Sequence, residues 1–256
     1  MEVSGHWVFL RGLVRQQKHW ERFPQLFAEA FPKAQVHTLD LPGNGILCDR
    51  PSPLSVQRMM EVARSQLAAQ GVIGSGADGT INLLAISLGG MVAIEWMHRH
   101  RHEVACAVII NSSLRDVGSL FDRLQPANYP AILKTMLLER NHLSREKLIL
   151  DISSNLYPHK TELAQKWAGY ARTHPTSMKN SLRQLLAAAR YRAPGRRPHD
   201  RVLLLNSAHD RLVNPACSER IAQRWQWPLR THARAGHDLP LDDGQWIIQQ
   251  VREWQP

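Results

Sequence analysis

Three short segments of the chain are apolar at nearly every position: residues 81–86 ("INLLAI"), 106–110 ("CAVII") and 202–205 ("VLLL"). A strand with one face in water would alternate apolar and polar side chains, whereas a strand buried on both faces does not need to. Segments with helical spacing of apolar residues lie between these runs. Because continuous apolar strands that alternate with helices are typical of parallel sheets, the sequence predicts an α/β fold with an open, mostly parallel sheet covered on both faces.

The other elements follow the same alternation along most of the chain, without an internal repeat. The longest predicted helix covers residues 15–31, where Trp20, Phe23, Phe27 and Ala30 have helical spacing. The remaining predicted strands cover residues 6–12, 34–43, 103–113 and 229–236, and the remaining predicted helices of this kind cover 55–70, 89–100, 216–225 and 244–254.

The alternation stops between about residues 114 and 199, where the patterns are helical only. Ligands of open parallel sheets bind beyond the carboxyl ends of the strands, where an inserted helical segment would form a wall of the pocket. The predicted division is therefore a core of residues 1–113 and 200–256 with a helical cap of residues 114–199. The cap helices are predicted near 129–139, 144–153, 160–172 and 176–191.

The formal net charge is +10. A positive field favours encounters with acidic partners, such as an acidic carrier protein or an anionic substrate, although a basic surface without a dedicated partner stays an alternative. No zinc-finger, basic-zipper or RNA-recognition pattern is present, so no nucleic acid is expected. The chain also lacks a secretory signal pattern and any apolar run long enough to span a membrane, and a cytoplasmic protein is expected.

No metal or organic cofactor is expected either. Cys48, Cys106 and Cys217 are far apart and form no metal, redox or disulfide pattern. His98 and His102 have the spacing of helical metal ligands, but no H-E-x-x-H sequence accompanies them. The end of a solvated helix is the expected role of this pair.

Ser87 directly follows the predicted strand 81–86 and precedes a helix. This is the context of a nucleophile elbow, a tight turn that lifts a serine clear of the sheet and needs small neighbours. Ala85, Gly89 and Gly90 are such neighbours, although the usual pattern G-x-S-x-G has glycine at the position of Ala85. A buried structural serine is the alternative.

A serine needs a base to remove its proton and an acid to orient that base. In the order Ser, Asp, His, the acid and the histidine are expected after later strands. Asp210 follows the predicted strand 201–207, and His237 follows the last predicted strand. The alternatives are His209 and His232 for the base and Asp116 for the acid, while Asp238, Asp242 and Asp243 are expected to be solvated or capping residues.

Four motifs together make the pattern specific: "FLRG" followed by Trp20, "LDLPGNG" (39–45), "AISLGG", and the pair "NSAHDRLV" and "AGHDLP". With them the chain resembles the α/β-hydrolase superfamily over nearly its whole length. The small helical cap and short loops are similar to those of soluble carboxylesterases, including the biotin-pathway methyl-ester esterase.

The resemblance implies an α/β-hydrolase fold and a role for each site residue. It implies Ser87 as nucleophile, His237 as general base and then acid, and Asp210 as the orienting carboxylate. It also implies that the backbone N–H groups of Leu88 and Leu13 form the oxyanion hole.

Arg11 departs from the family pattern, because it stands where the family usually has histidine before the glycine. A scaffold role and a positive charge for a substrate carboxylate are both open for this residue. The expected activity is that of a serine hydrolase that cleaves a small carboxylic ester through an acyl-enzyme intermediate. Hydrolysis of a thioester or lactone, action on carrier-bound acyl groups, and a non-catalytic binding protein on the same scaffold are the alternatives.

Overall fold

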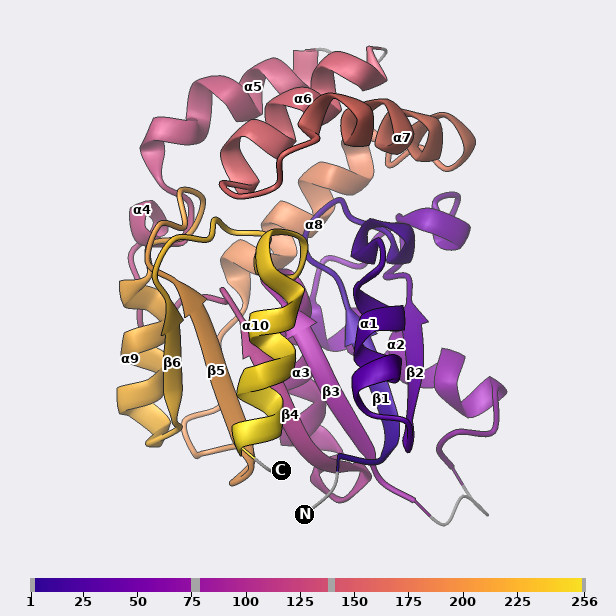
Figure 1. The fold of residues 1–256 in the computed structure, drawn as a ribbon, viewed down its shortest axis with the longest axis vertical. Helices are drawn as coiled ribbons and strands as arrows, with labels where there is room; N and C mark the ends of the chain where they lie inside the picture. Colours follow the sequence, from indigo (N-terminus) through magenta and orange to yellow (C-terminus); the bar gives the residue numbers. More distant parts are fainter. Residues whose placement is uncertain (1–2, 75–78, 138–140, 255–256) are drawn as a thin grey trace.

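A computed structural model describes residues 3–74, 79–137 and 141–254. Within these residues six strands form one sheet in the order β2-β1-β3-β4-β5-β6, and every neighbouring pair is parallel (Figure 1). The α/β class and the doubly covered parallel sheet are therefore confirmed. The strands are β1 (Gly5–Leu10), β2 (Ala34–Leu39), β3 (Ile81–Ile86), β4 (Val104–Ile110), β5 (Val202–Ser207) and β6 (Leu229–His232).

Two apolar cores lie on opposite faces of the sheet, because successive side chains of a strand point to opposite faces. In β3, Leu83 and Ala85 belong to one core, and Leu84 and Ile86 belong to the other. Residues of β3 are buried on both faces, which explains its unbroken apolar run. The first core packs against α2 (Val56–Ala69), α3 (Leu88–Arg99) and α9 (Ala216–Trp225), and the second packs against α1 (Phe23–Ala30) and α10 (Leu239–Trp254).

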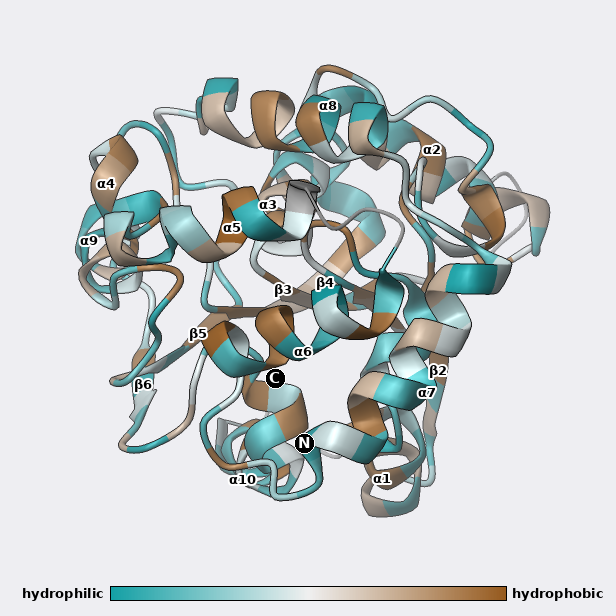
Figure 2. Cartoon of the chain, turned by 90° about the horizontal axis from the view of Figure 1, so that it is seen from above, coloured by the Kyte–Doolittle hydropathy of each residue, from teal (hydrophilic) through white to brown (hydrophobic). Residues whose placement is uncertain are grey.

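Between β4 and β5 the described chain forms helices and no strand. Figure 1 shows α5, α6 and α7 beyond the carboxyl ends of the strands, and Figure 2 looks down on them from above. Five α-helices occupy this part of the described chain: α4 (Leu120–Arg123), α5 (Tyr129–Leu137), α6 (His142–Ser153), α7 (Lys160–Thr173) and α8 (Met178–Arg190). The short α4 was not predicted, and the end of the helix predicted over 129–139 lies outside the described residues.

The prediction of one helix over residues 15–31 is wrong. The structure has a 3-10 helix, η1 (Gln17–Trp20), and then α1. Pro24 in the first turn of α1 has no backbone N–H to donate, so it favours the start of a helix and disfavours a helix running through it. Glu21 between the two helices has a φ of 52°, which ends the first one.

No helix among the described residues combines the length and the apolarity needed to cross a membrane. The three cysteines are free thiols. Over the same residues, no group of three or more His, Cys, Asp or Glu side chains is placed to hold a metal ion. His98 and His102 are exposed, and they do not share a helix, because α3 ends at Arg99.

Candidate active site

Ser87 lies in a strained turn between β3 and α3. Its φ of 57° and ψ of −120° are unusual for a residue with a side chain, and such conformations cost about 1–3 kcal/mol. Hydrogen bonds hold this backbone: the Ser87 N–H donates to the Ile110 carbonyl (2.9 Å), and the Ser87 carbonyl accepts from the Gly90 N–H (2.9 Å), the Ser112 hydroxyl (2.9 Å) and the Met91 N–H (3.4 Å). The serine is thus fixed at the carboxyl edge of the sheet.

The small residues around Ser87 are required by close backbone packing. A Cβ on Gly89 would overlap the Leu10 carbonyl oxygen, and one on Gly90 would lie 2.8 Å from Cβ of Ser112. A Cβ on Gly12 would lie 3.0 Å from Cβ of Ser87 and 3.5 Å from its Oγ. The loop after β1 therefore passes directly beside the serine hydroxyl.

Asp210 and His237 form a close pair. Nδ1 of His237 lies 2.7 Å from Oδ2 of Asp210, and Oδ1 of Asp210 accepts from the backbone N–H groups of Leu212 (2.8 Å) and Val213 (2.9 Å). With Asp210 accepting at Oδ2, Nδ1 carries the proton and Nε2 is left as the basic nitrogen. Burial disfavours a charged imidazole, but the Asp210 carboxylate outweighs burial, so the pKa of His237 is raised from its ordinary value.

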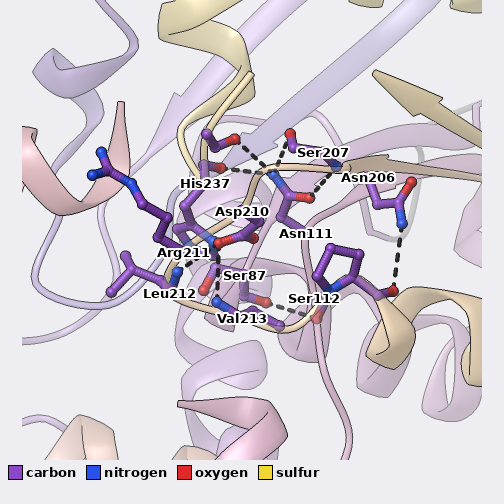
Figure 3. A network of polar contacts seen from close by, with 12 residues as sticks. Ser87, Asn111, Ser112, Asn206, Ser207, Asp210, Arg211, Leu212, Val213 and His237 are labelled. Carbon is purple, nitrogen blue, oxygen red and sulfur yellow. Dashed lines mark hydrogen bonds and ion pairs between the residues drawn. The ribbon is translucent and has the colours of Figure 1, made fainter. Parts of the chain in front are cut away.

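Ser87 and His237 line the same cavity, which has a volume of about 250 Å³ and is mostly apolar. Figure 3 shows Ser87 beside the Asp210–His237 pair. None of the described residues forms a hydrogen bond with Oγ of Ser87, so the hydroxyl is available for a reaction. An apolar pocket with a few converging polar groups is the usual form of a small-molecule site.

Leu88 and Leu13, the two predicted oxyanion-hole residues, also line this cavity. Leu88 is the first residue of α3, where backbone N–H groups lack helical partners. Leu13 lies in a turn closed by a hydrogen bond from the Arg15 N–H to the Gly12 carbonyl (3.3 Å). Neither N–H has a partner among the described residues, so both can donate a hydrogen bond to a ligand oxygen.

The same turn contains a second strained residue, Val14. Its φ is 58°, a genuine outlier for a β-branched side chain. Its N–H donates to Oε1 of Gln184 in α8 (2.9 Å), and Gln184 is fully buried. The cap helix α8 therefore holds the loop that carries Leu13.

Asn111 was missed in the sequence, although it supports the candidate base. It follows β4 with a φ of 45°, and its Nδ2 donates to the His237 carbonyl (2.8 Å) and to Oγ of Ser207 (3.1 Å). Its Oδ1 accepts from the Ser207 N–H (2.9 Å). Figure 3 shows how this one amide joins the ends of β4 and β5 to the loop of His237. The only signal was a polar residue directly after a buried strand.

Arg11 is paired within the protein. Its Nη1 and Nη2 donate to Oδ1 (3.0 Å) and Oδ2 (2.6 Å) of Asp238, and its guanidinium lies 4.8 Å from the ring centroid of Trp20. The expectation that Asp238 is a solvated residue is wrong, because only 4% of this residue is exposed and its carboxylate is bound to Arg11. The pair joins the loop after β1 to the loop of His237, and the Asp238 carboxylate offsets the charge of Arg11.

Asp242 joins the candidate base to the cap. Its carboxylate accepts from the Gly236 N–H (2.7 Å), the Ser154 hydroxyl (2.6 Å) and the Asn155 N–H (2.8 Å). Residues 154–155 follow α6, and Gly236 precedes His237. Asp242 thus joins the loop of His237 to the residues after α6, a role that was not expected from the sequence.

The other candidate acids and bases lie outside the cavity. Asp116 accepts from the Ala193 N–H (3.0 Å), and His232 contacts the Asp243 carboxylate at 3.2 Å. His209 is exposed beside Asp210. Of the described histidines, only His237 lines the cavity together with Ser87.

Solved structures with the same fold include several hydrolases. An esterase from Rhodococcus sp. ECU1013 is 20% identical (TM-score 0.72, covering 98% of this chain and 90% of that chain). A thermophilic esterase from Thermogutta terrifontis is 17% identical (TM-score 0.70, 100% and 90%), and an enol-lactonase from Burkholderia xenovorans LB400 is 14% identical (TM-score 0.73, 99% and 92%). At these identities the similarity shows the fold alone.

None of the curated proteins is significantly similar to the chain in sequence. The model of the alpha/beta hydrolase family matches residues 5–250, which is nearly the whole chain. The chain therefore belongs to the alpha/beta hydrolase family.

Proposed function

We propose that the protein is a serine hydrolase that cleaves carboxylic esters through an acyl-enzyme intermediate. The observation that carries the proposal is the 2.7 Å contact between His237 and Asp210 beside a strained, unpartnered Ser87 hydroxyl on the same cavity. Membership in the alpha/beta hydrolase family supports hydrolysis in general.

In the first half of the proposed reaction, Nε2 of His237 takes the proton of Ser87 while Oγ attacks the ester carbonyl. The N–H groups of Leu13 and Leu88 stabilise the oxyanion, and Asp210 stabilises the imidazolium. His237 then gives its proton to the leaving alcohol. In the second half, water attacks the acyl-enzyme with His237 again as base, and the acid and Ser87 are released.

The cavity walls favour an apolar portion of the substrate. They include Met91, Leu124, Ile149, Ile152 and Leu185 from α3 and the cap. We place the protein among soluble carboxylesterases with small caps, with the biotin-pathway group as one candidate within them and a small ester as substrate. A cytoplasmic location is part of the same proposal.

Labelling with a fluorophosphonate tests the nucleophile, because the reagent captures an activated serine. We expect labelling of the native protein, and its complete loss in Ser87→Ala. Ser113→Ala is the matched control, since Ser113 is a second serine lining the cavity, and it should keep the label. Absence of labelling in the native protein would favour the non-catalytic binding protein.

A panel of p-nitrophenyl esters, thioesters and lactones distinguishes the hydrolytic alternatives, since all three use the same groups. Preference for oxygen esters supports the proposal, and a clear preference for thioesters would replace it. Action on groups attached to an acidic carrier predicts a kcat/KM that falls steeply with salt, because salt screens exposed charges. A flat response would argue against such a carrier.

A further inference from the structure

A second cavity adjoins the one that contains Ser87. Its volume is about 210 Å³, and it shares Val14, Arg15 and Arg145 with the first. The two cavities thus meet at the turn after β1 and the first turn of α6. Arg15 therefore lies where both cavities can be reached.

The second cavity is chemically different from the first. Its lining includes three histidines, His19, His142 and His174, and the hydroxyl residues Thr176 and Ser177. The first turn of α6 and the residues directly before α8 contribute to it, and helix N-termini favour anions. This lining suits a polar group rather than an alkyl chain.

The charges of the described residues that line the two cavities are mainly positive. They comprise four arginines and two carboxylates: Arg11, Arg15, Arg123 and Arg145, with Asp238 and Glu146. Asp238 pairs with Arg11, and Glu146 pairs with Arg15. In a site of low dielectric, a lining with more cationic than anionic side chains attracts an anionic ligand.

Arg15 is the residue of this set with an unused donor at the junction. Its Nη1 donates to Oε2 of Glu146 (2.7 Å) and lies 3.2 Å from Nε2 of His19, while its guanidinium lies 4.9 Å from the ring centroid of Trp167. Its Nη2 is buried and has no partner among the described residues, and only 8% of the residue is exposed. A buried guanidinium nitrogen without an acceptor is costly, and a ligand oxygen would relieve that cost.

The positive charge at this junction is carried by arginine and not by His19. Burial, and then the charges of Arg15 and Arg11, lower the pKa of His19 well below its ordinary value. A neutral His19 can accept a hydrogen bond from Arg15 and help to orient its guanidinium.

The backbone ties Arg15 to the candidate oxyanion hole. Arg15 is the fourth residue of the turn that begins at Gly12, and the ends of such a turn lie within about 7 Å of each other. Gly12 in turn packs against Ser87. Since Arg15 and Ser87 line the same cavity, one ligand can present an anion to Arg15 and a carbonyl to Ser87.

We propose that Arg15 binds an anionic oxygen group of the substrate, so that the preferred esters carry a carboxylate or phosphate on a short chain. This inference rests on the proposed function and names the substrate class of the same site. It assigns anion binding to Arg15 rather than to Arg11, because Arg15 lines both cavities and Arg11 lines only the first.

The test compares p-nitrophenyl esters of straight-chain acids with their ω-carboxylate counterparts of equal length, in the native protein and in Arg15→Met. Arg15→Met/Glu146→Gln is the second variant, because Arg15→Met alone leaves Glu146 buried without a counter-charge. We expect kcat/KM for the anionic esters to fall about 30-fold or more, the usual size for losing a buried charge contact, and for the neutral esters less than about threefold. Arg183→Met is the control, because Arg183 bonds the Ser52 carbonyl between cap and core and lines neither cavity. It should change both classes of ester by less than about twofold.

Binding to Ser87→Ala, measured by calorimetry with glutarate, inorganic phosphate and neutral glutaramide, identifies the anion without turnover. Arg15-dependent binding of glutarate alone assigns a carboxylate, and Arg15-dependent binding of phosphate alone assigns a phosphate. Equal losses for anionic and neutral esters, or binding that Arg15→Met does not change, would overturn the inference. If neutral esters are hydrolysed and Ser87 is labelled in that case, the proposed function stands while the inference about Arg15 fails.

Discussion

The sheet core and the cap are stabilised by different kinds of contact. Every residue of β3 is buried, and the two cores on its faces include Trp7, Trp96 and three phenylalanines of α1 and its flanks. The cap has one small buried cluster, formed by Leu150, Leu163, Ala164 and Trp167. Among its exposed apolar side chains are Leu120, Phe121 and Leu133, which are 58%, 61% and 59% exposed.

Polar contacts attach the cap to the core, beside a few apolar residues such as Ala187 and Tyr191 that pack in the first core. Asp242 accepts from residues after α6, Glu146 of α6 pairs with Arg15, and Gln184 of α8 holds the Val14 N–H. Several of these contacts end on the loops that carry the candidate oxyanion hole and the candidate base. The comparison teaches that the core fixes the reacting groups, while the cap fixes the loops around them and the shape of the pocket.

The largest expected effect is on chemistry that belongs to the core alone. Asp210→Asn should lower kcat by about 10⁴-fold, because the orienting carboxylate is lost while the fold remains. Since Asp210 raises the pKa of His237 and a neutral imidazole is the base, the native kcat/KM should fall with decreasing pH through a pKa above about 6.5. In the variant, burial acts without the carboxylate, so this acid limb should move to lower pH.

Stopped-flow or steady-state rates from pH 5 to 9 provide the measurement, with circular dichroism as the folding control. An acid limb at the same pH in both proteins would contradict the assignment of His237 and Asp210.

The next effect concerns the buried pair between the two loops. Arg11→Met should destabilise the protein by about 3–5 kcal/mol, because it leaves Asp238 buried without a counter-charge. The double variant Arg11→Met/Asp238→Leu should recover most of that loss, since the uncompensated charge is removed. Urea unfolding of both single variants and the double variant gives the coupling. A double variant no more stable than Arg11→Met would show that charge pairing is not the main role of these residues.

A smaller effect is expected where the cap meets the loop of His237. Asp242→Ala removes the acceptor of several hydrogen bonds and should cost on the order of 2–3 kcal/mol. Hydrogen exchange should increase at residues 154–157 before it increases in the sheet. Asp243→Ala is the matched control, because Asp243 contacts His232 and the Trp246 N–H within the core and should leave residues 154–157 unchanged. Exchange that rises equally in sheet and cap would mean that the cap is not a separately attached layer.

The smallest effect is expected at the cap surface. Phe121→Ser replaces a side chain that is 61% exposed and should change the free energy of unfolding by less than about 0.5 kcal/mol. Phe9→Ser is the contrasting variant, because Phe9 is fully buried among Trp20, Phe23 and Phe27. Thermal unfolding of both proteins makes the comparison. A large loss of stability in Phe121→Ser would show that the Phe121 side chain makes packing contacts in spite of its exposure.

Most of the fold was predictable because a strand that is buried on both faces has apolar residues at nearly every position. The apolar runs of β3, β4 and β5 and the helical patterns of the cap all correspond to observed elements. The prediction of one helix over 15–31 was wrong because the apolar periodicity continues across Glu21 and Pro24. The backbone at Glu21 ends the first helix, and Pro24 favours the start of the second. The four-residue α4 is too short for periodicity to show.

The candidate site was predictable where a residue's place after a strand determines its position. Ser87, Asp210 and His237 were identified in this way, and the structure brings Asp210 and His237 into contact. The partners of Asp238 and Asn111 were not predictable, because each bond joins segments far apart in the sequence. For the same reason, the sequence alone suggested Arg11 as one possible partner of a substrate carboxylate and gave no indication of Arg15. The surroundings of Arg15 come largely from α6 and α7.

The turn from Gly12 to Arg15 has a consequence for redesigning selectivity. Each of its four residues has a separate role. Gly12 packs against Ser87, Leu13 carries a candidate oxyanion donor, Val14 has a strained backbone, and Arg15 is the proposed anion-binding residue. An insertion or deletion here would shift all of these at once, so turnover would be sacrificed together with substrate choice. Mutational libraries aimed at new substrates should leave this tetrapeptide intact and vary Ile149 and Ile152 on α6, whose apolar side chains line the cavity and form no hydrogen bond with the turn.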